Sequence, residues 1–133
     1  MTAQGEDILA WTEHAITARE EAANAAPRSP WSVLVDDDAL IAPDGIPVVE
    51  AFALSGQQTR AILNHVALHD PASVLRRCAA DRKILHLHGG RGHSCSAIDA
   101  DGDLDEHARF YDHEVCDTVR ALAEGYGWTE GER

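Results

Sequence analysis

The sequence has few aromatic side chains and few cysteines, and it contains no long apolar run. Its 133 residues include three Trp, two Tyr, two Phe and three Cys. A small, odd number of cysteines does not support a disulfide framework. No apolar run approaches the roughly 18 residues that would cross a bilayer, and no signal-peptide pattern is present. These absences predict a cytoplasmic protein without a membrane partner.

The core is expected to be thin. Alanine supplies much of the 44% hydrophobic content, and an alanine side chain buries little apolar area. A chain of this length fits one domain, which we place over residues 1–133, and buries roughly two-thirds of its unfolded surface. A bound metal ion would therefore add usefully to its stability.

Basic residues are the scarcer charge, because 11 Lys and Arg face 23 Asp and Glu and leave a net charge of −12. Such a balance argues against a general nucleic-acid or anionic-membrane surface. The charge is uneven: residues 99–117 hold eight acids and one arginine, whereas residues 60–91 hold six basic side chains and two acids. Either stretch is most simply a solvated face. The sharper interpretation is a surface that docks a partner protein.

Hydrophobic periodicity divides the chain into helical and extended segments. Apolar residues recur every three or four positions before Pro27, which predicts an amphipathic helix. The β-rich runs of residues 31–54 are broken by turn residues and predict two or three short antiparallel strands. Ser55 and Asp70 are each placed as a helix N-cap, with Pro71 at a first helical position. We predict an α+β fold with an N-terminal helix and Pro-rich turn (1–30, the helix at about 5–24), a small sheet (31–54), a helical part (55–124, with helices at about 56–69, 71–88 and 113–124) and a tail (125–133).

Residues 89–112 have no period and are predicted to form a loop. Metal-ligand residue types bracket it, and together they define a predicted zinc loop over residues 88–116. A structural zinc site needs four tetrahedral nitrogen or sulfur ligands, often as two short-range pairs. The pairs here are His93-x-Cys95 and His113-x-x-Cys116, and the second would share a face on the first turn of a helix. His88 could replace either histidine, because the glycines after it let the chain fold back. We predict a structural zinc ion bound by Cys95 and Cys116, with His88 and His113 next and His93 a close rival.

Other chemistries fit less well. The acids of residues 99–106 resemble a calcium loop, but neither frame puts glycine at the sharp turn. The segment 113–117 resembles the His-Glu-x-x-His helix of zinc peptidases, so a zinc hydrolase with Glu114 as its base is an alternative. A second alternative is a nucleic-acid-associated regulator that uses the basic helix 71–88, although no aromatic residues interleave with its charges.

Several segments resemble one family. The stretch from Ala26 to Trp31 is similar to the opening of small actinobacterial and phage proteins. The stretch His65-Val66-Ala67-Leu68-His69-Asp70-Pro71-Ala72-Ser73-Val74-Leu75-Arg76 resembles one typical of the "six-two-two-one" domain-of-unknown-function family of actinobacteria and their phages. The match continues through residues 82–88 and resumes over 116–123.

This resemblance implies an actinobacterial or phage origin and assigns no reaction. It also implies a small zinc knot in which Cys116, Cys95 and His88 match best. Together with the residue patterns, it leads us to predict a small soluble binding or adaptor protein. We expect it to be non-enzymatic, to carry a structural zinc site and to act on a partner protein.

Overall fold

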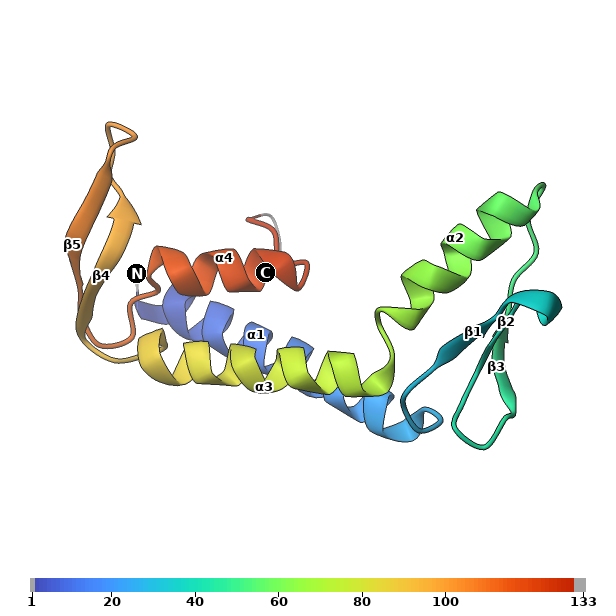
Figure 1. The fold of residues 1–133 in the computed structure, drawn as a ribbon. Helices are drawn as coiled ribbons and strands as arrows, with labels where there is room; N and C mark the ends of the chain where they lie inside the picture. The colour runs from blue at the N-terminus through green and yellow to red at the C-terminus, as the bar shows by residue number, and fades with distance from the viewer. Residues whose placement is uncertain (1, 131–133) are drawn as a thin grey trace. The chain divides into compact units, whose positions relative to one another are not determined.

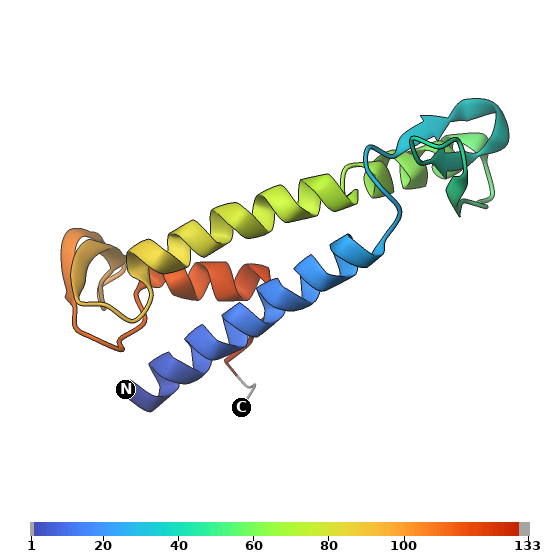
Figure 2. The same cartoon turned by 90° about the horizontal axis from the view of Figure 1, so that it is seen from below.

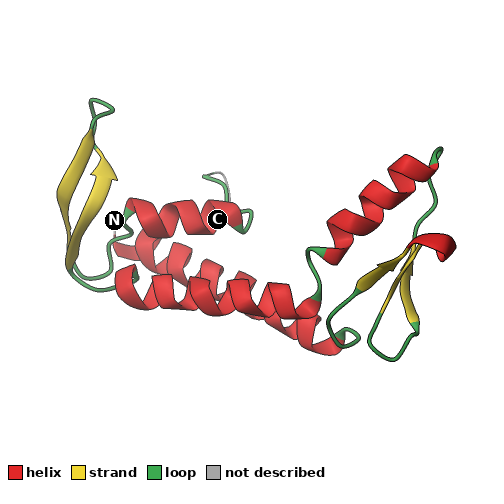
Figure 3. Ribbon diagram, in the orientation of Figure 1, coloured by secondary structure: helices red, strands yellow, loops and turns green. Residues whose placement is uncertain are grey.

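The structure, a computed structural model, describes residues 2–130 as two compact units (Figure 1). One unit comprises residues 19–78, and the other comprises residues 2–18 and 79–130. Helices α1 (Thr2–Ala25) and α3 (Pro71–His88) each run through both units. Figure 3 shows helices together with two small sheets, which confirms the predicted α+β class. Within the described residues, no helix combines the length and the apolar character that a membrane crossing requires.

The unit of residues 19–78 is built on a three-stranded antiparallel sheet in the order β1-β2-β3. Leu40 of the central strand pairs with Val33 on one side and Val49 on the other. Leu40 packs with Ala51 and Leu63 in a buried cluster that includes a residue of helix α2. The elements are β1 (Ser32–Leu34), a 3-10 turn (Val35–Asp37), β2 (Ala39–Ile41), β3 (Pro47–Glu50) and α2 (Gly56–Ala67).

Both predicted helix caps are present. The Ser55 hydroxyl accepts a hydrogen bond from the Gln58 amide at 3.2 Å, which caps α2. One carboxylate oxygen of Asp70 accepts from the Ser73 amide at 3.0 Å at the start of α3. The other oxygen accepts from the Trp31 amide at 3.2 Å. Asp70 therefore caps a helix and ties the segment before β1 to it.

Removing the Asp70 carboxylate should destabilise the protein in a pH-dependent way. Burial alone would raise the pKa of Asp70, but hydrogen bonds from Ser73, Trp31 and Ser29 outweigh burial and lower it. A lowered pKa means that the ionised group stabilises the fold above the unfolded-state value and loses this effect as pH falls. We expect Asp70→Ala to cost about 1–3 kcal/mol at neutral pH, and less below about pH 4, in urea unfolding. The exposed Asp37→Ala is the control, and a cost for Asp70→Ala that grows toward low pH would contradict the argument.

In the other unit, the N-terminal half of α1 lies along the C-terminal half of α3 and contacts α4 (Asp117–Gly125), as Figure 2 shows from below. Ile8, Ala123 and Trp128 form a buried cluster there. Trp128 belongs to the stretch expected as a tail, yet only 6% of it is exposed. The Tyr126 hydroxyl donates a 2.6 Å hydrogen bond to the buried Asp81 carboxylate.

The prediction of a structureless loop over residues 89–112 was wrong. Strands β4 (His93–Ile98) and β5 (Leu104–Phe110) form an antiparallel hairpin there. Its tight turn uses Gly102 at φ 85°, and Asp99 accepts hydrogen bonds from the amides of Asp101 and Asp103. The Asp-Gly pair was the available turn signal. In these strands, charged side chains and the histidines and cysteine stand where β-branched residues are usual. The alternation of apolar and polar residues that identifies a strand is therefore absent.

The predicted start of the last helix was also wrong. Helix α4 begins at Asp117, and Cys116 takes the N-cap position with an extended backbone at φ −81° and ψ 167°. His113 has a positive φ of 69°, which is incompatible with the first turn of a right-handed helix. The chain before Cys116 therefore approaches α4 as a turn.

Candidate metal centre

Three segments of one unit bring four ligand side chains together. His88 is the last residue of α3, His93 and Cys95 lie on β4, and Cys116 immediately precedes α4. The metal-binding atoms of the four residues all lie within 4.8 Å of one another. Four of the five residues that the sequence indicated thus share one centre.

Three of the six separations between the donor atoms match the edges of a tetrahedral site. His88 Nδ1 lies 3.3 Å from His93 Nε2, and that nitrogen lies 3.3 Å from Cys95 Sγ. His88 Nδ1 lies 3.7 Å from Cys116 Sγ. With Zn–N near 2.0–2.1 Å and Zn–S near 2.3 Å, the edges of a tetrahedron measure roughly 3.3–3.8 Å. The donor set therefore fits one ion bound by two nitrogens and two sulfurs.

Local backbone geometry explains why these residues meet. Side chains two apart on a strand share a face, so His93 and Cys95 point the same way while Ser94 between them is exposed. The connection from α3 to β4 turns back tightly through Gly89 and Gly90. A Cβ at Gly89 would lie 2.7 Å from the Leu85 carbonyl oxygen, and Gly90 has φ 73°. Glycine at these positions allows His88 and His93 to approach each other.

The ring of His93 is oriented for binding through Nε2. Its Nδ1 lies 2.8 Å from the Arg91 carbonyl oxygen, which can only accept, so Nδ1 carries the proton and donates. The unprotonated Nε2 then faces the other three ligands, as in metal sites where a carbonyl sets the tautomer. The Phe110 ring stacks on His93 with centroids 5.7 Å apart and shields it.

Burial disfavours the charged forms of the Cys95 thiol and the His88 imidazole when no cation is bound, because it shifts the pKa of each group. Cys116 is fully buried and Cys95 is half-buried. Burial, reinforced by Cys116 and Asp117, raises the pKa of the Cys95 thiol to about 11. Burial and the neighbouring His93 lower the pKa of His88, which favours the neutral imidazole that binds metals. A bound dication would favour the thiolate forms of the cysteines and release their protons.

Two nearby carboxylates accept hydrogen bonds from backbone amides and thereby hold the segments around the centre together. The Asp112 carboxylate accepts from the Gly92 amide at 2.7 Å, just before His93. The Asp117 carboxylate accepts from the Ile98 amide at 2.8 Å, which ties the far end of β4 to the first residue of α4. These two supporting acids could not be identified from the sequence, because nothing in their spacing indicated a strand.

His113 and Glu114 have other contacts. His113 is exposed, its amide donates to the Gly90 carbonyl at 3.2 Å, and it is outside the four-residue group found within the described residues. A Glu114 carboxylate oxygen accepts from the Tyr111 amide at 2.6 Å. His113 was predicted as a ligand on a helix that began at residue 113, and that start was wrong.

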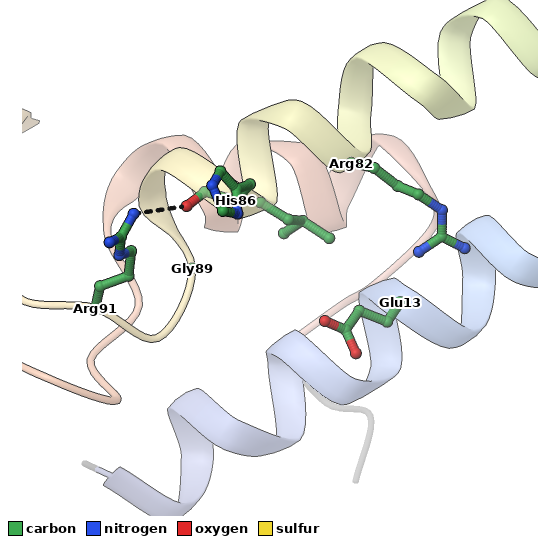
Figure 4. Close-up of a pocket in the computed structure, with 6 residues that line it drawn as sticks. Glu13, Arg82, His86, Gly89 and Arg91 are labelled. Carbon is green, nitrogen blue, oxygen red and sulfur yellow. Dashed lines mark hydrogen bonds between the residues drawn. The ribbon is translucent and has the colours of Figure 1, made fainter.

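A cleft of about 530 Å³ lies beside the turn that follows α3 (Figure 4). Arg91 donates to the His86 carbonyl oxygen at 3.4 Å, which braces this turn. The lining mixes cationic side chains with the Glu13 carboxylate and indicates no particular ligand class. The residues around it are Glu13, Arg82, Leu85, His86, Gly89 and Arg91.

Two histidines in the last turn of α3 provide a matched test of the centre. His88 belongs to the four-residue group, whereas His86 is exposed and outside it. We expect His88→Ala to weaken the binding of added Zn²⁺ by more than the roughly 10–100-fold that loss of a supporting contact costs. His86→Ala should bind as the parent does in competition with a chromogenic chelator. Equal affinities for the two variants would remove His88 from the centre.

Comparison with known proteins places the chain in a family. A family model described as a family of unknown function (DUF6221) matches residues 5–127. No curated protein and no solved structure matches the chain. The match spans most of the 133 residues and includes all four residues of the centre. The chain belongs to this family of unknown function.

Proposed function

We propose that this protein is a small, non-enzymatic binding protein in which His88, His93, Cys95 and Cys116 hold a structural Zn²⁺. The observation that carries the proposal is the convergence of four protein donor atoms within 4.8 Å. Two imidazoles and two thiolates in a tetrahedron are a donor set that suits zinc. Four protein ligands fill the tetrahedron and leave no position for a substrate or a reactive water.

The role of the ion follows from what it would join. It ties the end of α3, strand β4 and the start of α4 through side chains of three separate segments. A two-stranded hairpin is marginally stable alone in water. Metal binding therefore supplies stability that apolar burial does not, because the affinity for the ion becomes folding free energy.

The surface that this arrangement would present is the acidic tip of the β4–β5 hairpin. A fixed hairpin displays its charges in a constant geometry, which reduces the ordering cost of binding. A partner with a basic surface suits this tip, and electrostatic attraction would speed its association. The exposed acids of the tip and its flanks are Asp99, Asp101, Asp103, Asp105 and Glu106.

Exchange of the ion for Co²⁺ separates a structural centre from a hydrolytic one. A hydrolase needs three protein ligands and an open position. Its base would be Glu114, but the Glu114 carboxylate accepts a hydrogen bond from the Tyr111 amide. We expect the Co²⁺ form to show the intense visible absorption of a tetrahedral thiolate site, unchanged by added azide. A spectrum that shifts with azide would reveal an open position and favour the hydrolase.

The binding role is tested by removing charge from the hairpin tip. Asp99 is kept because its carboxylate organises the turn, and Asp101, Asp103 and Asp105 are changed together to asparagine. We expect the parent to retain a cationic peptide column at low salt and the triple variant to elute earlier. An unchanged elution, with zinc still bound, would exclude the tip as a surface for basic partners.

A further inference from the structure

We propose that Cys95 and Cys116 are a peroxide-sensitive pair, and that their oxidation to a disulfide expels the zinc ion. The inference rests on the proposed zinc centre and adds a mode of regulation to it. Its basis is the placement of both sulfurs at one point of the fold, where metal coordination would keep them as thiolates. The thiolate is the form of cysteine that oxidants attack.

The two sulfurs are already neighbours. They lie within 4.8 Å of each other. A disulfide brings sulfurs to about 2.05 Å. The two sulfurs would therefore have to approach each other by at most about 2.8 Å. Strand β4 and the N-cap of α4 would then be joined covalently.

Unequal exposure sets the order of reaction. Cys95 is half-buried between the exposed Ser94 and Ser96, so a small oxidant reaches it first. Cys116 is fully buried and is placed to act second, as the resolving thiol. Cys78 is only 1% exposed and is outside the metal-binding group of the described residues. It serves as an internal control for the selectivity of the pair.

The chemistry balances with hydrogen peroxide as the oxidant. The Cys95 thiolate attacks one peroxide oxygen, the O–O bond breaks, and the departing hydroxide takes a proton to become water. The Cys116 thiolate then attacks the sulfur of the Cys95 sulfenic acid, the S–S bond forms, and a second hydroxide leaves as water after protonation. The two thiolates together lose two electrons, and zinc leaves as Zn²⁺ with its oxidation state unchanged.

The oxidised centre would connect fewer parts of the fold. A disulfide preserves the link between β4 and α4, but it releases His88 and His93. The end of α3 then loses the tie made through the metal, although the glycine-rich turn of residues 89–92 keeps the hydrogen bonds of Gly92 to Asp112 and of Gly90 to His113. Oxidation would therefore loosen one defined turn while the hairpin stays attached to α4.

The test uses the full chain loaded with zinc and treated with hydrogen peroxide. Zinc release is followed with a chromogenic chelator, and the product is mapped by mass spectrometry after alkylation of free thiols. We expect about one zinc ion released per disulfide, a mass decrease of about 2 Da before alkylation, and an alkylated Cys78. Amide exchange should accelerate in residues 89–92. Cys78→Ala should behave as the parent does, and Cys95→Ala should form no intramolecular disulfide.

Separate results decide the zinc centre and its regulation. If the protein binds zinc tightly but peroxide leaves the ion in place, the inference about oxidation is wrong and the structural centre stands. Release of zinc with only sulfinic acids, or with a disulfide to Cys78, would also overturn it. A chain that binds no zinc at all overturns both proposals before peroxide is added.

Discussion

Replacement of Cys116 by alanine is expected to abolish tight zinc binding and to lower the free energy of unfolding by several kcal/mol. Cys116 is the most buried of the four ligands, and it connects the start of α4 to the centre. Structural zinc binding is worth on the order of 10 kcal/mol or more in small zinc domains. Loss of one of four ligands removes much of this binding free energy, and the melting temperature should fall by roughly 10 °C or more.

The matched control for this variant is Cys78→Ala. Cys78 is as buried as Cys116 but does not belong to the four-residue group. Its replacement removes apolar contacts and should cost about 1–2 kcal/mol, with or without chelator. The cost of Cys116→Ala should instead fall in excess chelator to about the same 1–2 kcal/mol, because the parent then lacks the ion as well and only apolar contacts are lost. A Cys116→Ala variant that binds zinc like the parent would contradict the assignment.

Removal of zinc by a strong chelator is expected to expose the hairpin to hydrogen exchange. Without the ion, β4 and β5 depend on their own ladder and on the carboxylate bonds of Asp112 and Asp117. We expect their amides to lose at least about 100-fold in protection, which corresponds to roughly 2.7 kcal/mol. The amide of Leu40 on the central strand of the other sheet should change little.

Re-addition of zinc supplies the control for the chelator. Protection in β4 and β5 should return to its starting level when free Zn²⁺ is restored in excess. Equal loss of protection at Leu40 would mean that the whole chain unfolds and that the effect is not confined to the hairpin. Unchanged protection in the hairpin would show that no ion holds it.

The features that the sequence predicted well are those governed by local chemistry. Ser55 and Asp70 cap their helices as expected, because an N-cap needs only a side-chain oxygen next to the first amides. Pro71 marks the start of α3, and the glycines after His88 mark its end. The candidate ligands could be recognised by their density, which is a property of composition along a short stretch.

The features that were missed depend on backbone geometry. The choice between His93 and His113 turned on a hairpin and on one positive φ, and neither follows from residue types alone. Ligand and charged residues occupy strand positions in β4 and β5, so the hydrophobic alternation that identifies strands was absent. Trp128 gave no periodic signal, yet it packs against the nearby Ala123 and against Ile8, which is distant in sequence.

X-ray absorption at the zinc edge, on protein purified without added metal, tests the central proposal most directly. The proposed centre requires about one zinc ion per chain, with two sulfurs near 2.3 Å and two nitrogens near 2.0 Å. The Cys116→Ala variant should show one sulfur ligand fewer or contain no zinc. A zinc-free protein that also fails to take up Zn²⁺ would contradict the account. A shell of nitrogen and oxygen without sulfur would contradict it equally.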